Sequence, residues 1–536
     1  MNKISTRWKA SLSIAAMLIL SVVASLFYQQ EHFTEVKNSY EKSLPPADLE
    51  KNPLEYIKDD FTVDAEFSSH LPIVILDTGG ETAPITMKQT KEGIFVPIEG
   101  IEPYIDGTFR ILHSETGRNT LTDKPSQESK IKIKRRGNTS MLYDKAQWLI
   151  KMQTATGEQN EVDLLNMGAN DEWILNGSVA DKSMLRNYLV YSLTSEIMPY
   201  TPDSHFCEVL IKNKEGYQYE GVYLLQENII QGPDRVDIAP YKRSAAVNSY
   251  LVRRDRIDID KNMLKTKHHG KGEQIEYFGL LYPSKYKVTE EMIDYVSADV
   301  NLMEDVLYAE DFNIFSTYPQ YIDVDSFVNY FLINEFFGSY DAGNYSTYFY
   351  KDLGGKITMG PVWDFDNTMD NFNLKPMEIE HLGFQIKPWF QQLCRDKAFI
   401  HKLEKQYAAL RRSTFSETHV INKIDEIVAY LGGARQREWK RWEAIYTGNN
   451  TISTLRLDPY KDKDGDLIQR YTMEYEHEIN RIKTMLRKHA NEMPYQFKIL
   501  EKRAEVSTDN SHFNGILLFL CSMVFIVPAV YVGFKK

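Results

Sequence analysis

Short runs in which apolar and polar residues alternate dominate the chain from Leu71 onward. Four such runs, LPIVILD, GIFVPI, TFRILH and KIKIKRRG, are bounded by Gly, Asp and Pro, and a fifth covers 146–152. A period of two is the pattern of half-buried strands, and the bounding residues favour turns. The sequence therefore predicts a β-meander, followed by strands at 206–212 and 220–227 that the turn sequence NKEG joins as a hairpin.

Apolar residues at helical spacing predict helices further along the chain. The first covers roughly Lys182–Met198. Residues 288–310 and 323–338 predict two more, and the second of these is so apolar that it should be buried. Residues 396–500 are mostly helical and charged, with a break near Gly432. The chain is thus predicted to be rich in strands first and in helices later.

A predicted hairpin separates two groups of acidic residues. Its strands are Tyr345–Tyr350 and Lys356–Pro361; Asp341 precedes the first, and Asp364 and Asp366 follow the second. Antiparallel strands bring the residues just outside their two ends together, so these carboxylates should lie close in space. Several carboxylates in an apolar neighbourhood need a cation or a reacting hydroxyl to offset their desolvation.

These residue types fit phosphoryl transfer. Mg²⁺ usually binds one or two protein carboxylates together with phosphate oxygens, which suits Asp364, with Asp366 on the same strand face. Asp341 suits the base that accepts the proton of a substrate hydroxyl, and Asn344 would be a further metal ligand. The alternative for each is an ordinary turn or cap residue, because Asp and Asn are common there.

A second candidate site begins with Arg136-Gly137-Asn138, followed by Thr and Ser. Gly permits close backbone approach, and the polar side chains offer donors to phosphate oxygens, although a plain turn is the alternative. Lys151 lies in a strand after this loop, where kinases carry the lysine for the α- and β-phosphates. Lys145 is the alternative lysine.

A strand lysine of this kind needs an acidic partner. Glu227, at the end of the apolar run GVYLLQE, is one candidate, and Glu196 in the first predicted helix is another. The segment that ends at Glu227 would equally serve as the hinge that binds adenine. Spacing alone does not decide between these roles.

Composition excludes several classes of protein. The 536 residues suffice for two or three domains, or for one large domain with additions. The net charge of −12, without a basic tract, argues against nucleic acid as the main partner. Three cysteines exclude a disulfide scaffold, and 12% aromatic residues argue against disorder.

Two apolar segments, 10–28 and 515–534, predict transmembrane helices. Lys and Arg precede the first, and two Lys follow the second, so the positive-inside rule predicts that both termini are cytoplasmic. The protein is thus predicted to be a two-pass protein of the cell membrane whose residues between the segments are extracytoplasmic. A cleaved signal peptide is the alternative for the first segment.

These residues resemble the spore coat protein H (CotH) kinase family, atypical protein kinases of bacteria and some fungi. The likeness runs from about Leu71 to Asn371 and is most specific in YIDVDSFVNYFLINE, STYFYKD and GPVWDFD. KRRGNTS, DKSMLRN and GVYLLQE add to it. The chain departs from the family pattern after Arg-Gly-Asn, where TSM replaces Ser-Ser-Trp, and after Asp366, where NTMD replaces Leu-Ala-Phe-Gly.

The resemblance implies transfer of phosphate from ATP to Ser or Thr with Mg²⁺ or Mn²⁺, with Asp341 as the catalytic aspartate and Asp364 as a metal ligand. The implied fold is α+β: an atypical protein-kinase-like fold with a β-rich N-terminal part and a helical C-terminal part, flanked by two transmembrane helices. The predicted parts are a cytoplasmic N-terminus (1–9), a transmembrane helix (10–28), a linker (29–66), the kinase-like domain (67–395), a helical extension (396–505) and a second transmembrane helix (515–534).

The expected acceptor is a cell-surface protein with a Ser or Thr, or an envelope polymer; the membrane segments argue against assuming a spore coat substrate. ATP is scarce outside the cytoplasmic membrane, so this reading needs supplied nucleotide or another donor. Two other functions use the same residues. One is a non-catalytic surface module that keeps the fold, and the other is a metal-dependent hydrolase, which leaves Lys151 unexplained.

Overall fold

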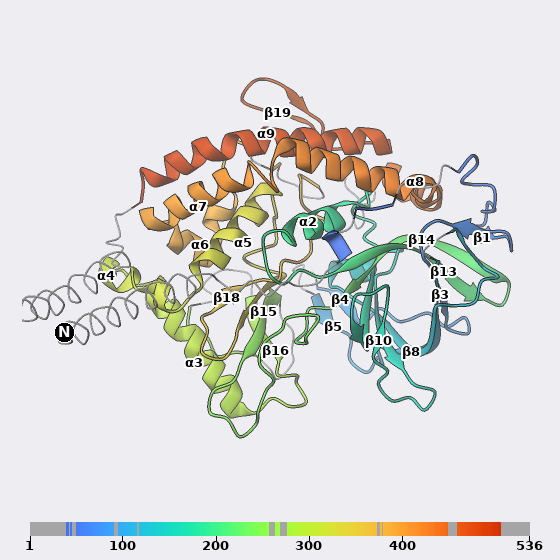
Figure 1. Cartoon of the computed structure of the whole chain (residues 1–536), viewed down its shortest axis with the longest axis horizontal. Coiled ribbons are helices and arrows are strands. Elements are labelled where there is room, and N and C mark those ends of the chain that lie inside the picture. Colours follow the sequence, from blue (N-terminus) through green and yellow to red (C-terminus); the bar gives the residue numbers. More distant parts are fainter. Residues whose placement is uncertain are drawn as a thin grey trace, which may run out of the picture. The chain divides into compact units, whose positions relative to one another are not determined.

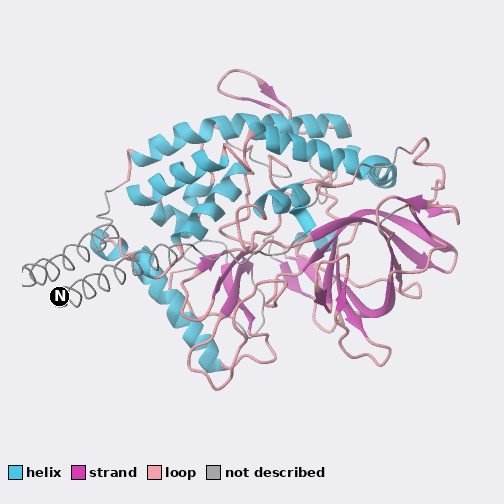
Figure 2. Ribbon diagram, viewed as in Figure 1, coloured by secondary structure: helices cyan, strands magenta, loops and turns pink. Residues whose placement is uncertain are grey.

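A computed structural model provides the fold of this chain (Figure 1). The chain divides into two units, 1–37 and 38–536, and the residues that the structure describes all belong to the second. The described ranges are 39–41, 43–45, 50–90, 95–114, 117–256, 263–268, 276–371, 376–377, 379–448 and 458–504. Strands prevail in the first half of this unit and helices in the second; Figure 2 shows that the strands and most of the helices occupy different regions of the unit.

The strands of the first half form a sheet that closes on itself. Its members are β1 (Thr62–Val63), β3 (Ile73–Asp77), β6 (Ile105–Leu112), β8 (Gln127–Arg135), β9 (Trp148–Gln153), β12 (Glu172–Asn176), β13 (Ser204–Asn213) and β14 (Gly216–Glu227). The order is β1-β14-β12-β9-β8-β6-β3-β13, and β13 pairs back with β14, so seven strands make a ring with β1 at its edge. The contact between β3 and β13 is parallel and the others are antiparallel.

Alternate residues of these strands fill the interior of the ring. Val74, Phe109, Ile131, Ile150 and Trp173 belong to one buried cluster there. Each large apolar side chain that leaves water contributes about 1.5–3 kcal/mol, so this cluster dominates the stability of the ring. The structure confirms the strands that the alternating sequence predicts here, because in a strand every second residue faces the same side, which in this sheet is the core.

A second sheet carries the hairpin between the acidic groups. Its order is β16-β15-β17-β18, with all pairs antiparallel. The strands are β15 (Tyr250–Arg256), β16 (Glu276–Tyr282), β17 (Thr347–Lys351) and β18 (Thr358–Met359). The predicted hairpin is confirmed. Short two-stranded pairs add β2 (Ser68–Ser69), β4 (Met87–Gln89), β5 (Phe95–Pro97), β7 (Asn119–Thr120), β10 (Val162–Asp163), β11 (Ala169–Asn170), β19 (Tyr460–Lys461) and β20 (Leu467–Ile468).

The helices lie mainly in the second half. They are α2 (Arg186–Thr194), α3 (Glu290–Leu307), α4 (Phe312–Phe315), α5 (Val324–Phe336), α6 (Pro388–Leu393), α7 (Lys397–Leu410), α8 (Glu417–Thr447) and α9 (Tyr475–Glu501). The 3-10 turns are η1 (Ser39–Glu41), η2 (Thr139–Leu142), η3 (Tyr318–Gln320) and η4 (Phe384–Ile386). In Figure 1, α5, α7 and α9 pack on one another, while α8 reaches across to β14.

Two predicted helix boundaries changed for local reasons. The first helix begins at Arg186 rather than Lys182, because Asp181 accepts hydrogen bonds from the backbone nitrogens of Ser183 (3.1 Å) and Arg186 (2.9 Å) and holds a turn before it. The predicted break near Gly432 is a kink within α8, where this residue has φ 45° and ψ −125°. A positive φ suits Gly, which has no Cβ.

The predicted kinase-like fold flanked by two transmembrane helices is wrong. The structure is an α+β fold whose N-terminal strands form a closed sheet, and closure depends on the pairing of β13 with β3, which alternation does not encode. None of the helices in the described ranges is long and apolar enough to cross a membrane, against the predicted two-pass location. The segments that suggested it, 10–28 and 515–534, lie outside the described residues.

A buried histidine joins α9 to α5. His489 is 1% exposed; its Nδ1 lies 2.9 Å from the carbonyl oxygen of Ile379, and its Nε2 lies 2.9 Å from the carbonyl oxygen of Glu335 and 3.1 Å from Oε1 of the same residue. Because both nitrogens face acceptors, both must donate, which makes the ring an imidazolium. Burial alone would lower the pKa of His489, but the hydrogen bond and charge of Glu335 raise it overall.

Replacement of this histidine should therefore destabilise the protein in a pH-dependent manner. A raised folded pKa contributes stability that is complete below the unfolded pKa of about 6.5 and is lost as pH rises through the folded pKa. We expect His489→Gln to lose roughly 3–5 kcal/mol at pH 6, and less at pH 9. Urea unfolding at both pH values measures this, with the exposed pair His401–Glu501 tested by His401→Gln as control. An equal loss at both pH values would contradict the imidazolium.

Candidate functional site

Three half-buried carboxylates, Asp341, Asp364 and Asp366, form an acidic centre at one end of the hairpin. Asp341 lies in a turn, where its carbonyl oxygen accepts hydrogen bonds from the backbone nitrogens of Asn344 (3.1 Å) and Tyr345 (2.8 Å). Burial is the main cause that raises the pKa of Asp366, and the charges of Asp181 and Asp341 add to it. The three side chains therefore act on one another electrostatically, as their places around the hairpin predicted.

Among the three carboxyl groups, Asp364 has a pKa that is raised to near neutrality. Burial, followed by the charge of Asp366, raises the pKa of Asp364 to about 7, although Arg136 and a 3.0 Å hydrogen bond from Ser346 Oγ oppose the shift. A hydrogen bond between the two carboxyl groups also acts on the pKa of Asp366. Without a cation, Asp364 therefore binds a proton at a higher pH than an ordinary aspartate does, and a raised carboxyl pKa is typical of functional sites.

Helix α2 and the turn before it hold this pair in place. The Ser178 hydroxyl donates to Oδ2 of Asp366, and the backbone nitrogen of Phe365 donates to Oδ1 of Asn187 (2.8 Å). Nδ2 of Asn371 donates to the carbonyl oxygen of Asp366 (2.6 Å). The acidic centre therefore belongs to the interface between the hairpin and the first helix.

A buried ionic network lies behind the loop that follows the pair. Nη1 of Arg186 is 2.5 Å from Asp181, its Nη2 is 2.7 Å from Glu478, and Arg481 is 2.8 Å from the same carboxylate. Arg481 also donates to the carbonyl oxygen of Asp370 (3.2 Å). Because each charge in this network has an opposite partner, burial is tolerated, and the network ties the loop to α2 and α9.

The predicted phosphate loop brings one basic side chain to the acidic centre. Gly137 has φ +95°, and a Cβ there would lie 1.9 Å from Oγ of Ser140, so the turn requires Gly. Nη1 of Arg136 donates to Oε1 of Gln147 (2.9 Å), and its guanidinium lies 5.4 Å from the centroid of a Trp363 ring. The half-buried Asn138 precedes the turn η2. Arg136 thus supplies positive charge beside Asp364.

Lys151 and Glu227 lie in other surroundings. Lys151 pairs with Glu172 across neighbouring strands at 2.7 Å, and Glu172, Tyr104 and Asp171 are the charges that act most on its pKa. Glu227 pairs with Arg235 at 2.5 Å. The partner of this lysine is therefore neither Glu227 nor Glu196, and the structure does not bring Lys151 together with the acidic centre. Asn344 shares the turn of Asp341 through its backbone.

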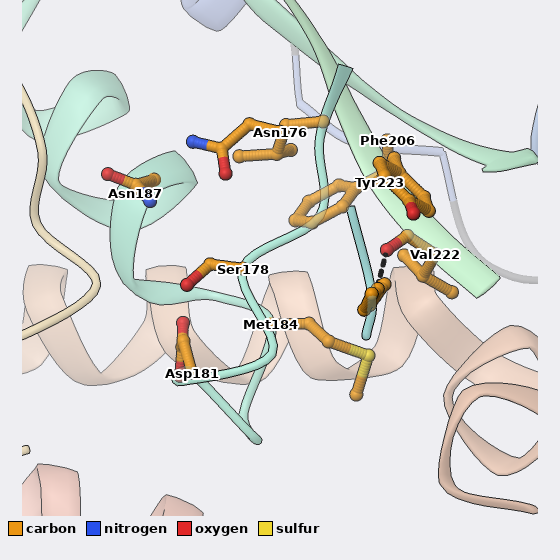
Figure 3. Close-up of a pocket in the computed structure, with 10 residues that line it drawn as sticks. Asn176, Ser178, Asp181, Met184, Asn187, Phe206, Val222 and Tyr223 are labelled. Carbon is orange, nitrogen blue, oxygen red and sulfur yellow. Dashed lines mark hydrogen bonds between the residues drawn. The ribbon is translucent and has the colours of Figure 1, made fainter. Parts of the chain in front are cut away.

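A small pocket adjoins the acidic centre through Ser178 (Figure 3). On one side of it, Nζ of Lys145 lies 2.6 Å from Oε1 of Glu438 and donates to the carbonyl oxygen of Val222 (2.8 Å). Oε2 of Glu438 accepts from the backbone nitrogen of Val222 (2.7 Å). The residues that line the pocket are Lys145, Asn176, Ser178, Asp181, Met184, Asn187, Phe206, Val222, Tyr223 and Leu224.

One polar atom in this pocket has no partner within the described part of the chain. Oδ1 of Asn176 is buried and unbonded, while its Nδ2 makes a long hydrogen bond of 3.4 Å to Gln226. Figure 3 shows the polar ends of Asn176, Ser178 and Asp181 in the same space. A buried polar atom without a partner costs free energy, so the pocket suits a polar ligand. Sequence reasoning missed Asn176 and Ser178, although DKSMLRN includes three members of the lining, Asp181, Met184 and Asn187.

The acidic centre offers a pair of carboxylates to a metal, with Asp341 nearby. Another group of possible metal ligands in the described ranges consists of His401, Glu404 and Glu501. Their ligand atoms lie within 4.8 Å of one another, and the three side chains are at least partly exposed. A pair is sufficient for Mg²⁺, which completes its coordination with water and phosphate oxygens. Hard oxygen donors are the ligands that Mg²⁺ and Mn²⁺ prefer.

Comparison with known proteins adds one match. A family model described as CotH kinase protein matches residues 133–493, which is more than half of the 536 residues. The matched range contains the acidic centre, the loop at Arg136 and Lys145. It also contains Glu438 and Glu478 in the helices of the second half. No curated protein matches the chain significantly.

Removal of one carboxylate should stabilise the metal-free protein. A raised folded pKa means that ionised Asp364 favours unfolding, and this loss is largest above pH 7. We expect Asp364→Asn to be more stable than wild type at pH 8 by on the order of 1–2 kcal/mol, with a smaller gain at pH 5. Thermal unfolding in EDTA measures this, and the exposed Asp144→Asn is the control. A destabilised Asp364→Asn at pH 8 would contradict the crowding.

Proposed function

This chain belongs to the CotH kinase protein family, and we propose that it transfers the γ-phosphoryl group of ATP to a Ser or Thr hydroxyl of a protein. The observation that carries the proposal is the acidic centre, in which Asp341 lies near the crowded pair Asp364 and Asp366. Phosphoryl transfer depends mainly on positioning and on neutralisation of charge, and this site offers the groups for both.

The carboxylate pair fits Mg²⁺ or Mn²⁺. Burial and the charge of Asp366 raise the pKa of Asp364, and burial with the charges of Asp181 and Asp341 raises the pKa of Asp366, so a divalent cation would offset this burial and repulsion in place of a proton. The Ser346 hydroxyl donates a hydrogen bond to Asp364, and the Ser178 hydroxyl donates one to Asp366. These bonds orient the two carboxylates before any cation binds. When bound, the metal would neutralise charge on the phosphate oxygens.

Asp341 is the proposed base. Its Oδ2 accepts a hydrogen bond from Nδ2 of Asn367 (2.8 Å), which orients the carboxylate. The other oxygen would accept the proton of the acceptor hydroxyl as that oxygen bonds to the γ-phosphorus. The bond between this phosphorus and the β,γ-bridging oxygen breaks, and ADP leaves with the electron pair. Arg136 beside the pair would balance negative charge on the transferred group.

Lys145 is the better supported lysine for the other phosphates. It lines the pocket that adjoins Asp366 through Ser178, whereas Lys151 pairs with Glu172, and neither of these two residues lines that pocket. Glu438 and the carbonyl oxygen of Val222 hold its ammonium group. Gly221 permits this, because a Cβ there would lie 2.2 Å from Oε2 of Glu438. We therefore propose Lys145 for the role first expected of Lys151.

The two aspartate roles make separable predictions. We expect Asp341→Asn to lower phosphate transfer by about 10²–10⁴-fold, because the proton acceptor is lost, while ATP with Mg²⁺ still raises Tm. We expect Asp364→Ala to lose metal-dependent transfer. Incubation with γ-labelled ATP and Mg²⁺ or Mn²⁺, followed by location of the label, measures both. Full transfer in both variants would refute the assignment.

Two matched double variants distinguish the lysines. Lys145→Met with Glu438→Gln removes one ion pair without leaving a buried charge, and Lys151→Met with Glu172→Gln does the same for the other pair. We expect the first to weaken ATP binding at least about tenfold, or about 1.4 kcal/mol, and the second to leave it near wild type. Calorimetric titration with ATP and Mg²⁺ is the measurement. Weaker binding in the second variant alone would restore Lys151 to the role.

A further inference from the structure

Two of the exposed apolar side chains that the structure describes lie beside the acidic centre. Tyr340, which directly precedes Asp341, is 58% exposed, and Ile386 at the end of η4 is 70% exposed. Large apolar side chains at this level of exposure are common singly. Two of them, one at the turn that carries the proposed base and one on a segment that contacts this turn, call for a reason that is specific to this place.

Lys387, which directly follows Ile386, joins the segment of Ile386 to the turn that carries Tyr340. Its ammonium group donates to the carbonyl oxygen of Tyr340 and lies 5.5 Å from the centroid of the Tyr340 ring. Its stem packs on the same turn, because a Cβ at Gly343 would lie 2.7 Å from Cβ of Lys387. Ile386, the preceding residue, is thus next to the turn that carries Tyr340.

Hydrogen bonds to α5 hold the second half of this surface. The carboxylate of Glu335 accepts from the backbone nitrogens of Gly383 (3.1 Å) and Phe384 (2.6 Å), at the beginning of η4. Phe384 packs on Phe331 and Phe390 in the core below. The 3-10 turn that presents Ile386 is therefore anchored, which makes it suitable for recognition.

The proposed reaction determines which part of the acceptor lies near this surface. An acceptor must bring its hydroxyl to Asp341, and an extended chain advances about 3.3 Å per residue. The residues one or two places from the hydroxyl therefore reach the neighbourhood of Tyr340 and Ile386. Tyr side chains are common energetic anchors in protein interfaces, and an aliphatic neighbour completes an apolar contact. The carboxylate of Asp341, which directly follows Tyr340, would repel an acidic residue of the acceptor, so the surface favours an apolar residue over an acidic one.

We propose that Tyr340 and Ile386 form the docking surface for the acceptor, an extended protein segment with a large apolar side chain within about two residues of the Ser or Thr. This inference rests on the proposed function, because it requires that Asp341 face the acceptor. It adds a class of substrate to that function: a segment that is apolar next to its hydroxyl, rather than one that is uniformly polar or acidic.

Two synthetic peptides with a single Ser test the inference. One carries Leu and Phe at the positions two before and two after the Ser, and the other carries Ala at both. We expect the wild type to phosphorylate the first with about tenfold higher kcat/KM, mainly through KM. The double variant Tyr340→Ala/Ile386→Ala should treat the two peptides alike, with an unchanged KM for ATP and unchanged release of phosphate to water. Tyr286→Ala, which removes an 88% exposed ring elsewhere, is the control and should keep the preference.

The outcomes separate this inference from the function on which it rests. Equal use of both peptides by the wild type, or a preference that survives in the double variant, would overturn the docking surface while ATP turnover continues. Loss of the preference with ATP turnover intact would support it. Absence of any phosphate release or transfer from ATP by the wild type would overturn the proposed function, and the docking surface with it.

Discussion

Repulsion among carboxylates in one half-buried site is the constraint on which the rest of this structure depends. Burial and the neighbouring charge raise the pKa of Asp364 to about 7, yet the pair with Asp366 is held by hydroxyl groups of Ser346 and Ser178. A structure that spends stability to keep like charges together is typical of a functional site. The charge that would relieve this repulsion, a divalent cation, is also the one that phosphoryl transfer requires.

The helices of the second half take part in this site. Glu438 on α8 pairs with Lys145, and Glu478 on α9 pairs with Arg186 behind the acidic pair. Both are almost fully buried, so neither pair is weakened by water in the manner of surface ion pairs. Residues 396–505 were predicted as an extension of the kinase-like domain. The contacts of this segment connect α8 and α9 to the pocket and to the loop that follows Asp366.

Local patterns in the sequence predicted much of this, and long-range pairing explains the rest. The hairpin between Asp341 and Asp364 was predictable, because adjacent antiparallel strands bring their flanking residues together. The partner of Lys145 was not predictable, because Glu438 lies 293 positions further along the chain, in helix α8. The closed sheet depends likewise on β13 meeting β3. The kinase-like fold was inferred from resemblance and the membrane helices from hydropathy; the structure contradicts the first, and no helix of its described residues could span a membrane.

The most direct test of the central claim is the position of the cation. Crystals of the protein grown with Mn²⁺ and ADP would locate the metal by its anomalous scattering. We predict one manganese ion between Asp364 and Asp366, about 2.1–2.2 Å from a carboxylate oxygen of each and in contact with a phosphate oxygen. A nucleotide bound with its manganese elsewhere, and with the two carboxylates still sharing a proton, would contradict the account.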